Sequence, residues 1–231
     1  MTTKSTILIL GASRGLGLAM AEEWLKRDAK VIATQRSASR DLSELQGRYP
    51  GSLEIETVDI VKAASVHALR ERLGGHRIDV LFVNAGLCKA HEETPSAVDE
   101  RDFVDMMLTN ALGPMRAVEL FENLVPANGA IAVMTSELGS IAGNRGFWEL
   151  YSSSKAALNM LMKCSRPAMP AIHARFCWSR QAGSAPTWGP RPQRSRSKKA
   201  SRSSWKPSGA VAAGPACASS TATVEPCPGD S

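Results

Sequence analysis

Tyr151 and Lys155 are the pair of residues in this sequence whose types and spacing most directly suggest chemistry. Residues four apart share one face of an α-helix, so the phenol and the ammonium would lie side by side. A neighbouring ammonium favours the phenolate and is expected to lower the pKa of the tyrosine. Such a tyrosine can donate a proton to a carbonyl oxygen or accept one from an alcohol. Taken alone, the spacing also fits an exposed surface pair.

Two further polar residues are candidates for the same site. Ser136 comes fifteen residues before Tyr151 and follows the apolar run Ala130–Met134. Asn110 lies inside a long helical pattern, where asparagine has a poor propensity. Its side chain could instead bond only to its own helix.

A glycine-rich turn follows the first apolar run of the chain. It contains the candidate cofactor-binding residues Gly11, Ser13, Arg14, Gly15, Leu16 and Gly17. Glycines allow a tight turn and let backbone N–H groups approach a pyrophosphate at the start of a helix. An ordinary cluster of loop glycines is the alternative, but the position between a strand and a helix favours a dinucleotide site.

The residues after the second apolar run indicate which dinucleotide would bind. An acidic residue there would hydrogen-bond a ribose 2′-hydroxyl, but residues 34–37 contain no acid and include Arg36. Together with Arg14, Arg36 would suit a 2′-phosphate, so NADP is favoured over NAD. Arg36 could also be a solvated charge at a strand end.

Small or polar residues also follow the third and fourth apolar runs. Asp59 and Ile60 come after the third and are candidates for the adenine end of the cofactor. Asn84, Ala85 and Gly86 come after the fourth, where small side chains would let the backbone lie against the cofactor. In parallel sheets, ligands bind outside the carboxyl ends of the strands, where all these residues would meet.

The elements that must position these residues are short apolar runs alternating with helical patterns. The expected strands are Thr6–Leu10, Lys30–Ala33, Leu53–Val58, Val80–Val83 and Ala130–Met134, and the expected helices are Leu16–Arg27, Ala64–Leu73 and Val98–Asn123. This order predicts an α/β fold with a doubly wound parallel sheet of the Rossmann type.

Composition narrows the class of protein. The chain has 231 residues, 43% of them hydrophobic, which suits one globular domain. Its five cysteines are widely spaced without a CxxC pair, so we expect neither a disulfide framework nor a metal site. It contains no apolar run long enough for a membrane span and no secretory h-region, so the expected location is the cytoplasm.

The net charge of +6 is distributed unevenly. Residues 1–164 carry 18 Lys and Arg against 20 Asp and Glu, whereas residues 165–231 carry 10 against 2. The last 67 residues also hold nine of the 13 prolines and no leucine. We therefore divide the chain into an α/β domain, residues 1–164, and a basic tail rich in Pro, Ser, Ala and Arg, residues 165–231.

Over about residues 5–164 the motifs resemble the short-chain dehydrogenase/reductase family, most closely its C-factor-like branch. The glycine turn, Asp59, Asn84–Gly86, Asn110, Ser136, Tyr151 and Lys155 match the motifs of that family in order. The resemblance implies hydride transfer between NADP(H) and a small-molecule carbonyl or secondary alcohol. We expect a homo-oligomer if the reading frame is restored, and neither nucleic acid nor membrane as a partner. A signalling or regulatory dinucleotide-binding protein with vestigial catalysis is the alternative.

The resemblance implies a role for each catalytic candidate. Tyr151 would be the acid or base, and Lys155 would lower its pKa and hold the nicotinamide ribose. Ser136 would hydrogen-bond the substrate oxygen. Asn110 would keep a proton-relay water and its helix in place.

The tail does not continue the family pattern, and three interpretations are open: a nucleic-acid-binding tail, an idle linker, or the product of a shifted reading frame. The third is favoured. Codons permitted for residues 179–189, read from one base earlier, give Val-Ala-Pro-Gly-Trp-Val-Arg-Thr-Asp-Met-Gly, which resembles the family's sixth strand and Pro-Gly turn. The slip would lie near residues 161–168. The sheet of the chain as written should then be incomplete after its fifth strand, leaving an unpaired edge.

Overall fold

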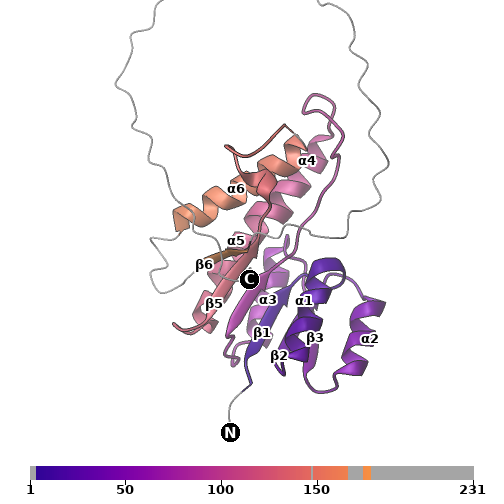
Figure 1. Cartoon of the computed structure of the whole chain (residues 1–231), viewed down its shortest axis with the longest axis vertical. Coiled ribbons are helices and arrows are strands. Elements are labelled where there is room, and N and C mark those ends of the chain that lie inside the picture. The colour runs from indigo at the N-terminus through magenta and orange to yellow at the C-terminus, as the bar shows by residue number, and fades with distance from the viewer. Residues whose placement is uncertain (1–3, 147, 166–173, 178–231) are drawn as a thin grey trace, which may run out of the picture. The chain divides into compact units, whose positions relative to one another are not determined.

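The computed structural model describes residues 4–146, 148–165 and 174–177 (Figure 1). All of them belong to the first of two compact units of the chain, residues 1–186. The second unit, residues 187–231, and most of the predicted tail lie outside the described residues.

The centre of the first unit is a sheet of six parallel strands in the order β3-β2-β1-β4-β5-β6. The strands are β1 (Thr6–Leu10), β2 (Lys30–Gln35), β3 (Leu53–Thr57), β4 (Val80–Val83), β5 (Ala130–Met134) and β6 (Ala174–Cys177). This is the strand order of a Rossmann fold, in which the direction of winding reverses between β1 and β4. The predicted fold class is thereby confirmed.

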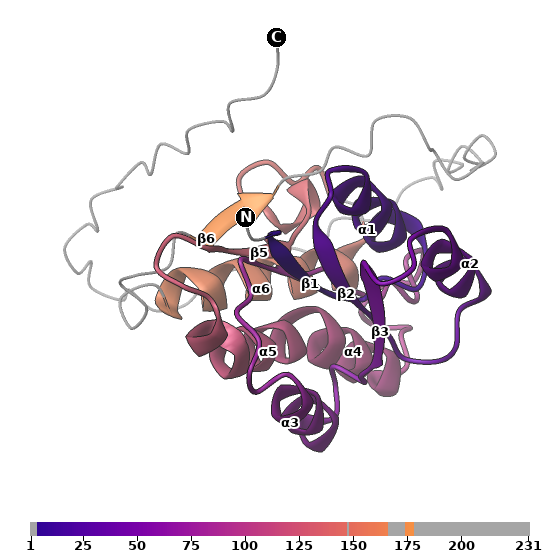
Figure 2. The same cartoon turned by 90° about the horizontal axis from the view of Figure 1, so that it is seen from below.

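Helices cover both faces of the sheet. They are α1 (Gly15–Lys26), α2 (Arg40–Arg48), α3 (Ala63–Arg72), α4 (Glu100–Met107), α5 (Gly113–Phe121) and α6 (Glu149–Ser165). Side chains of α1 and α2 join one apolar core, and side chains of α3, α5 and α6 join the other. Figure 2 shows the two layers of helices on opposite sides of the strands. The central strand β1 is buried on both faces, as its uninterrupted apolar sequence predicts.

The strand register brings the predicted site residues to one edge of the sheet. Leu10 of β1 pairs with Val83 of β4, and Val83 pairs with Val133 of β5. The residues that follow these three strands therefore emerge at nearly the same level. This edge lies at the reversal of winding, where sheets of this type bind ligands.

The single helix expected over Val98–Asn123 is divided in the structure. A π-helical turn, η1 (Leu108–Leu112), separates α4 from α5, and a 3₁₀ turn, η2 (Glu122–Leu124), follows α5. Pro114 lies in the first turn of α5 and has no N–H to continue an α-helical ladder, while Gly113 donates its N–H to Leu108 O across the wider turn. The wider turn includes Asn110.

Two further elements differ from the sequence-based expectation. The sheet does not end at β5, because β6 pairs with it in parallel from Ile131↔Ala174 to Met134↔Cys177. A parallel strand can be held by its backbone groups alone, so an unfavourable composition did not exclude it. Helix α2 was not predicted, because only Leu42 and Leu45 among its nine residues are buried apolar side chains.

Candidate active site

The glycine turn after β1 is packed against the end of β4. Gly11 has a φ of +94°, and a Cβ there would lie 2.8 Å from the backbone of Ala85. A Cβ on Gly17 would lie 2.0 Å from Gly11 O, so α1 begins in direct backbone contact with the turn. Asn84 donates its side-chain amide to Gly11 O at 2.7 Å. A Cβ at either position would collide with these neighbouring protein atoms, so the close approach of the turn, α1 and the end of β4 requires glycine.

The start of α1 presents backbone donors to the same edge. Gly15 takes a φ of +56°, and within the described chain no side chain caps this helix at Arg14. The helix dipole and the free N–H groups of its first turn, which includes Leu16, favour an anion. The buried Thr34 fixes the turn from β2 by accepting the Gly11 N–H at 3.0 Å.

A hydrogen bond holds the two arginine-bearing loops together. Ser39 donates its hydroxyl to Ser13 O at 2.6 Å, and its N–H donates to Gln35 Oε1 at 2.9 Å. The segment that carries Arg36 is thus closed on itself and attached to the turn that carries Arg14. Both arginines are exposed, so their guanidinium groups can reach a ligand at this rim of the sheet.

Asp59 and Ile60 lie beyond β3, at the edge of the sheet opposite β6. One Asp59 carboxylate oxygen accepts the Val61 N–H at 3.2 Å, and the other lies 3.7 Å from the Lys62 ammonium. Ile60 is buried, with its carbonyl 2.9 Å from where a Cβ on Gly113 would lie. In the structure Asp59 therefore shapes its own turn.

Asn110 connects three elements through one buried amide. Its Oδ1 accepts the Leu87 N–H at 2.7 Å, and its Nδ2 donates to Leu87 O at 2.7 Å and to Ser154 Oγ at 2.9 Å. The side chain does not bond back to its own helix. It ties the chain after β4 to α6 and so holds its helix in place, and its part in a proton relay stays a prediction.

Tyr151, Ser136 and Lys155 meet at the end of β5. The Lys155 ammonium is buried, donates to Met134 O at 2.8 Å and lies 5.9 Å from the centre of the Tyr151 ring. The Ser136 hydroxyl lies close enough to the Tyr151 phenol to influence its pKa. A Cβ on Gly86 would lie 3.7 Å from Lys155 Nζ and 3.5 Å from Asn110 Oδ1. The structure thus brings all four catalytic candidates together.

The electrostatics of this cluster differ from the expectation for Tyr151. Burial raises the pKa of Tyr151 above its ordinary value, the nearby Cys88 raises it further, and the Ser136 hydroxyl acts in the opposite direction. Burial also lowers the pKa of Lys155 from 10.5 to about 8. The predicted lowering of the tyrosine pKa by the ammonium is wrong for this structure, because desolvation dominates.

Several positioning residues have no signature in the sequence. Asn159 accepts the Thr135 hydroxyl at 2.6 Å and donates to Gly139 O at 3.3 Å. A Cβ on Gly139 would lie 2.9 Å from Lys155 Cβ, so this segment packs directly on α6. Ser154 donates its hydroxyl to Tyr151 O at 2.7 Å. Polar residues on one face of the helix that carries Tyr151 were the only signal that could have found them.

Within the described residues, no three His, Cys, Asp or Glu side chains gather where they could hold a metal ion. Among the helices that the structure describes, none is long and apolar enough to cross a membrane.

The strand order, the glycine turn at β1 and the anion-favouring start of α1 define a Rossmann-type dinucleotide-binding protein. The sequence profile of the short chain dehydrogenase family matches residues 5–171. The chain therefore belongs to the short-chain dehydrogenase/reductase family.

Two solved structures and one characterised relative illustrate this family. A Burkholderia multivorans short-chain dehydrogenase/reductase with bound NADP is 46% identical, with a TM-score of 0.72 over 75% of this chain and 77% of its own. A Pseudomonas aeruginosa carbonyl reductase in complex with NADP is 34% identical, with a TM-score of 0.67 over 71% and 76%. The 1-hydroxy-2-glutathionyl-2-methyl-3-butene dehydrogenase of a Rhodococcus strain is 30% identical over 68% of each chain.

The matched part of the chain spans only part of the length of other relatives. The stretches aligned with an oxidoreductase from Schizosaccharomyces pombe and with human 17-beta-hydroxysteroid dehydrogenase type 1 cover 66% and 50% of those proteins.

Proposed function

We propose that this protein transfers a hydride between NADP(H) and a small-molecule carbonyl or secondary alcohol. The observation that carries the proposal is the cluster of Ser136, Tyr151, Lys155 and Asn110 at the edge of the sheet that also holds the glycine turn. A hydroxyl that can donate a proton thus lies beside a dinucleotide cradle. This intact cluster favours catalysis over a purely regulatory dinucleotide-binding protein.

The residues present fit a dinucleotide. Gly11 and Gly17 allow the turn, α1 and the Asn84–Gly86 segment to pack closely, and a Cβ on Gly15, at the start of α1, would meet nothing within 4 Å. NADPH, when bound, supplies the hydride. The first turn of α1 would hold the pyrophosphate, and Asp59 and Ile60 would lie toward the adenine.

The preference for NADP rests on Arg14 and Arg36. Their segments are joined by the hydrogen bond from Ser39 to Ser13 O, so both guanidinium groups lie on the same side of the proposed dinucleotide site. A guanidinium binds a phosphate through charge-assisted hydrogen bonds, and residues 34–37 offer no acid to a 2′-hydroxyl. The NADP bound to the Burkholderia and Pseudomonas proteins supports the same choice.

The catalytic roles follow from the contacts. Tyr151 keeps its proton at neutral pH because burial raises its pKa, so it can donate that proton to a carbonyl oxygen during reduction. Ser136, which lies beside the phenol, would also hydrogen-bond the substrate oxygen. Lys155 would bind the ribose from its place above the tyrosine ring, and Asn110 would hold the floor of the site through Leu87.

The test compares the enzyme with its Tyr151→Phe variant for NADPH-dependent reduction of a panel of aldehydes and ketones. Because the tail is proposed to be out of frame, the assay uses a chain whose reading frame is restored after residue 164. Loss of the proton donor should lower turnover by about 10²- to 10⁴-fold while NADPH affinity stays nearly unchanged. Wild-type turnover by the variant would show that Tyr151 is not the acid.

A further inference from the structure

Two aromatic side chains from distant segments meet next to Tyr151. The rings of His91 and Trp148 lie edge to face with centroids 5.3 Å apart, and those of Trp148 and Tyr151 do the same at 5.9 Å. His91 belongs to the connection between β4 and α4, whereas Trp148 directly precedes α6. We call His91 and Trp148 the aromatic wall.

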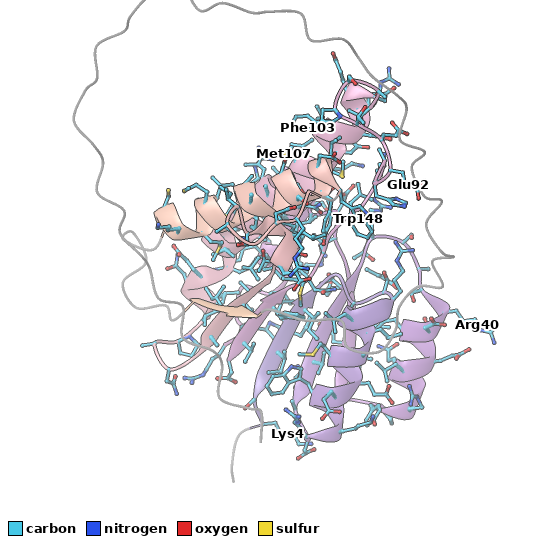
Figure 3. All side chains as sticks on the ribbon, turned by 45° about the horizontal axis from the view of Figure 1, so that its top comes forward. Lys4, Arg40, Glu92, Phe103, Met107 and Trp148 are labelled. Carbon is cyan, nitrogen blue, oxygen red and sulfur yellow. The ribbon has the colours of Figure 1, made fainter. Side chains whose placement is uncertain are left out.

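Trp148 is held in an unfavourable backbone conformation. Its φ is +52°, in the left-handed region that a bulky side chain rarely adopts. The Trp148 carbonyl accepts the Ser152 N–H at 2.8 Å, which ties the residue to the first turn of α6. Figure 3 shows Trp148 at the beginning of this helix. Strain of this kind persists where surrounding contacts hold it, and it clusters at ligand sites.

The segment that carries His91, the other residue of the wall, is also held in place. Leu87 exchanges two hydrogen bonds with the buried Asn110, and the Lys89 ammonium contacts Asp102 and Asp105 of α4 at 2.7 Å each. These contacts fix the segment that leads to His91. Because the Lys89 ammonium is paired with two carboxylates, it does not add an unpaired positive charge to this side of the site.

We propose that the aromatic wall is the substrate-selecting surface of the site, and that it takes carbonyl compounds with a flat aryl or conjugated group next to the carbonyl. The inference rests on the proposed function. A carbonyl oxygen bound by Tyr151 and Ser136 places its substituent beside the phenol, within reach of the Trp148 ring. Aromatic groups prefer edge-to-face or offset contacts with centroids about 4.5–7 Å apart, the separation that the wall already shows internally.

The test measures binding of two alcohols that differ in one respect. Benzyl alcohol and cyclohexylmethanol have rings of similar size, but only the first is flat and aromatic. Their dissociation constants are measured with NADP⁺ present, in the wild-type chain and in the Trp148→Ala, Trp148→Phe and Trp24→Phe variants. Trp24 lies on α1, where Arg27 stacks on it, and serves as the matched tryptophan control.

The wild type should bind benzyl alcohol roughly five- to tenfold more tightly than cyclohexylmethanol, which corresponds to one aromatic contact. Trp148→Ala should abolish this preference, Trp148→Phe should keep most of it, and Trp24→Phe should leave it unchanged. Equal affinities in the wild type, or a preference that survives Trp148→Ala, would overturn the proposal.

The 231-residue chain and the frame-restored chain both contain the wall, so both are measured. Every chain that binds NADP⁺ is used to judge the preference. Selective binding of benzyl alcohol without turnover of any aldehyde or ketone of the panel would contradict the proposed function alone. If neither chain binds NADP⁺, the proposed function fails and the inference fails with it.

Discussion

Lys155 buries an ammonium group beside the phenol of Tyr151, and the fold bears a cost for that placement. Lys155 is 2% exposed, and its ammonium donates a hydrogen bond to Met134 O. Its pKa falls from 10.5 to about 8 because the charged form is desolvated. A lysine kept there at such a cost points to a function outside stability.

This cost predicts a pH-dependent effect of Lys155→Met. Below pH 8 folded and unfolded chains both hold the proton, so the wild type bears the full cost of the buried charge. Between about pH 8 and 10.5 the unfolded chain binds more protons, so wild-type stability rises with pH relative to the variant. The stability of Lys155→Met minus that of the wild type should therefore fall by about 3 kcal/mol from pH 7 to 10.5. Urea unfolding at several pH values measures this difference, and a constant difference would refute the buried ammonium.

Arg36 makes a second prediction at the scale of the residue. Arg36→Asp places a carboxylate where a 2′-phosphate would bind, so the ratio of NADP⁺ to NAD⁺ affinity should fall by roughly 10- to 100-fold. Arg40→Asp is the matched control, because Arg40 is an exposed arginine of α2 that pairs with Glu44. The two dissociation constants are measured by titration. A similar loss in both variants would mean that only net charge matters.

At the scale of elements, α6 organises the site from one side. It carries Tyr151 and Lys155, receives Asn110 through Ser154, and holds the end of β5 through Asn159. Its positioning contacts are therefore as important as the groups that do chemistry.

Asn159 provides the test of this organisation. Asn159→Leu leaves the Thr135 hydroxyl without its acceptor, which should cost about 1–3 kcal/mol of folding stability. Because Ser136 is the next residue along, kcat should fall more than NADPH affinity. Lys163→Gln, an exposed change on the same helix, should alter neither quantity. An Asn159→Leu variant with wild-type kcat would show that this contact does not position Ser136.

Sequence patterns predicted the strands better than the helices, for physical reasons. The bounds of β1, β4 and β5 agree with prediction because strands buried on both faces are apolar throughout. The break near Asn110 depends on Pro114 and on a buried amide network, which periodicity does not report. Seven of the nine residues of helix α2 are polar, charged or glycine, so its two buried leucines gave too weak a signal.

In the candidate site, too, the sequence predicted some features and missed others. The spacing of Tyr151 and Lys155 indicated a shared helix face, and the structure places them together with Ser136 and Asn110. The burial that raises the pKa of Tyr151 could not be read from spacing, because desolvation depends on everything packed around the group. Asn159 and Ser154 act through single hydrogen bonds, which leave no pattern in the sequence.

At the scale of the whole molecule, we propose that the chain after about residue 164 is read out of frame. The position of β6 supports this proposal. Phenylalanine, cysteine and tryptophan have the codons TTY, TGY and TGG, so Phe176-Cys177-Trp178 read from one base earlier necessarily gives Leu-Leu. The shifted frame thus supplies apolar residues where the structure places a strand beside β5.

This proposal predicts different behaviour of the two chains. The frame-restored chain should be soluble, unfold cooperatively and bind NADP(H). The 231-residue chain should be less soluble and inactive. Its last 67 residues contain no leucine, so they lack the apolar side chains that would complete the sheet and its helix cover after β5. Sequencing the gene around codons 160–170 and comparing yield and unfolding of both chains tests it. A soluble, active 231-residue chain would make the tail a genuine part of the protein.

Self-association is a further proposal at this scale. Large apolar side chains are exposed on α4, η1 and α6, namely Phe103, Val104, Leu112, Met160 and Leu161. Helices α4 and α6 pack against each other, so these side chains belong to neighbouring elements (Figure 1). We propose that they contribute to a homo-oligomer of the frame-restored chain. Val104→Asp should shift its light-scattering mass toward the monomer, whereas an unchanged mass would exclude this surface.

The central claim is hydride transfer from NADPH to a carbonyl carbon, and isotope transfer tests it most directly. The frame-restored chain is incubated with benzaldehyde and NADPH that carries deuterium at the transferable position of the nicotinamide, in each stereochemical form. Mass spectrometry of the alcohol should find one deuterium on the carbinol carbon from one of the two forms. Benzyl alcohol without deuterium from either form, or no alcohol from any carbonyl of a wider panel, would contradict the account.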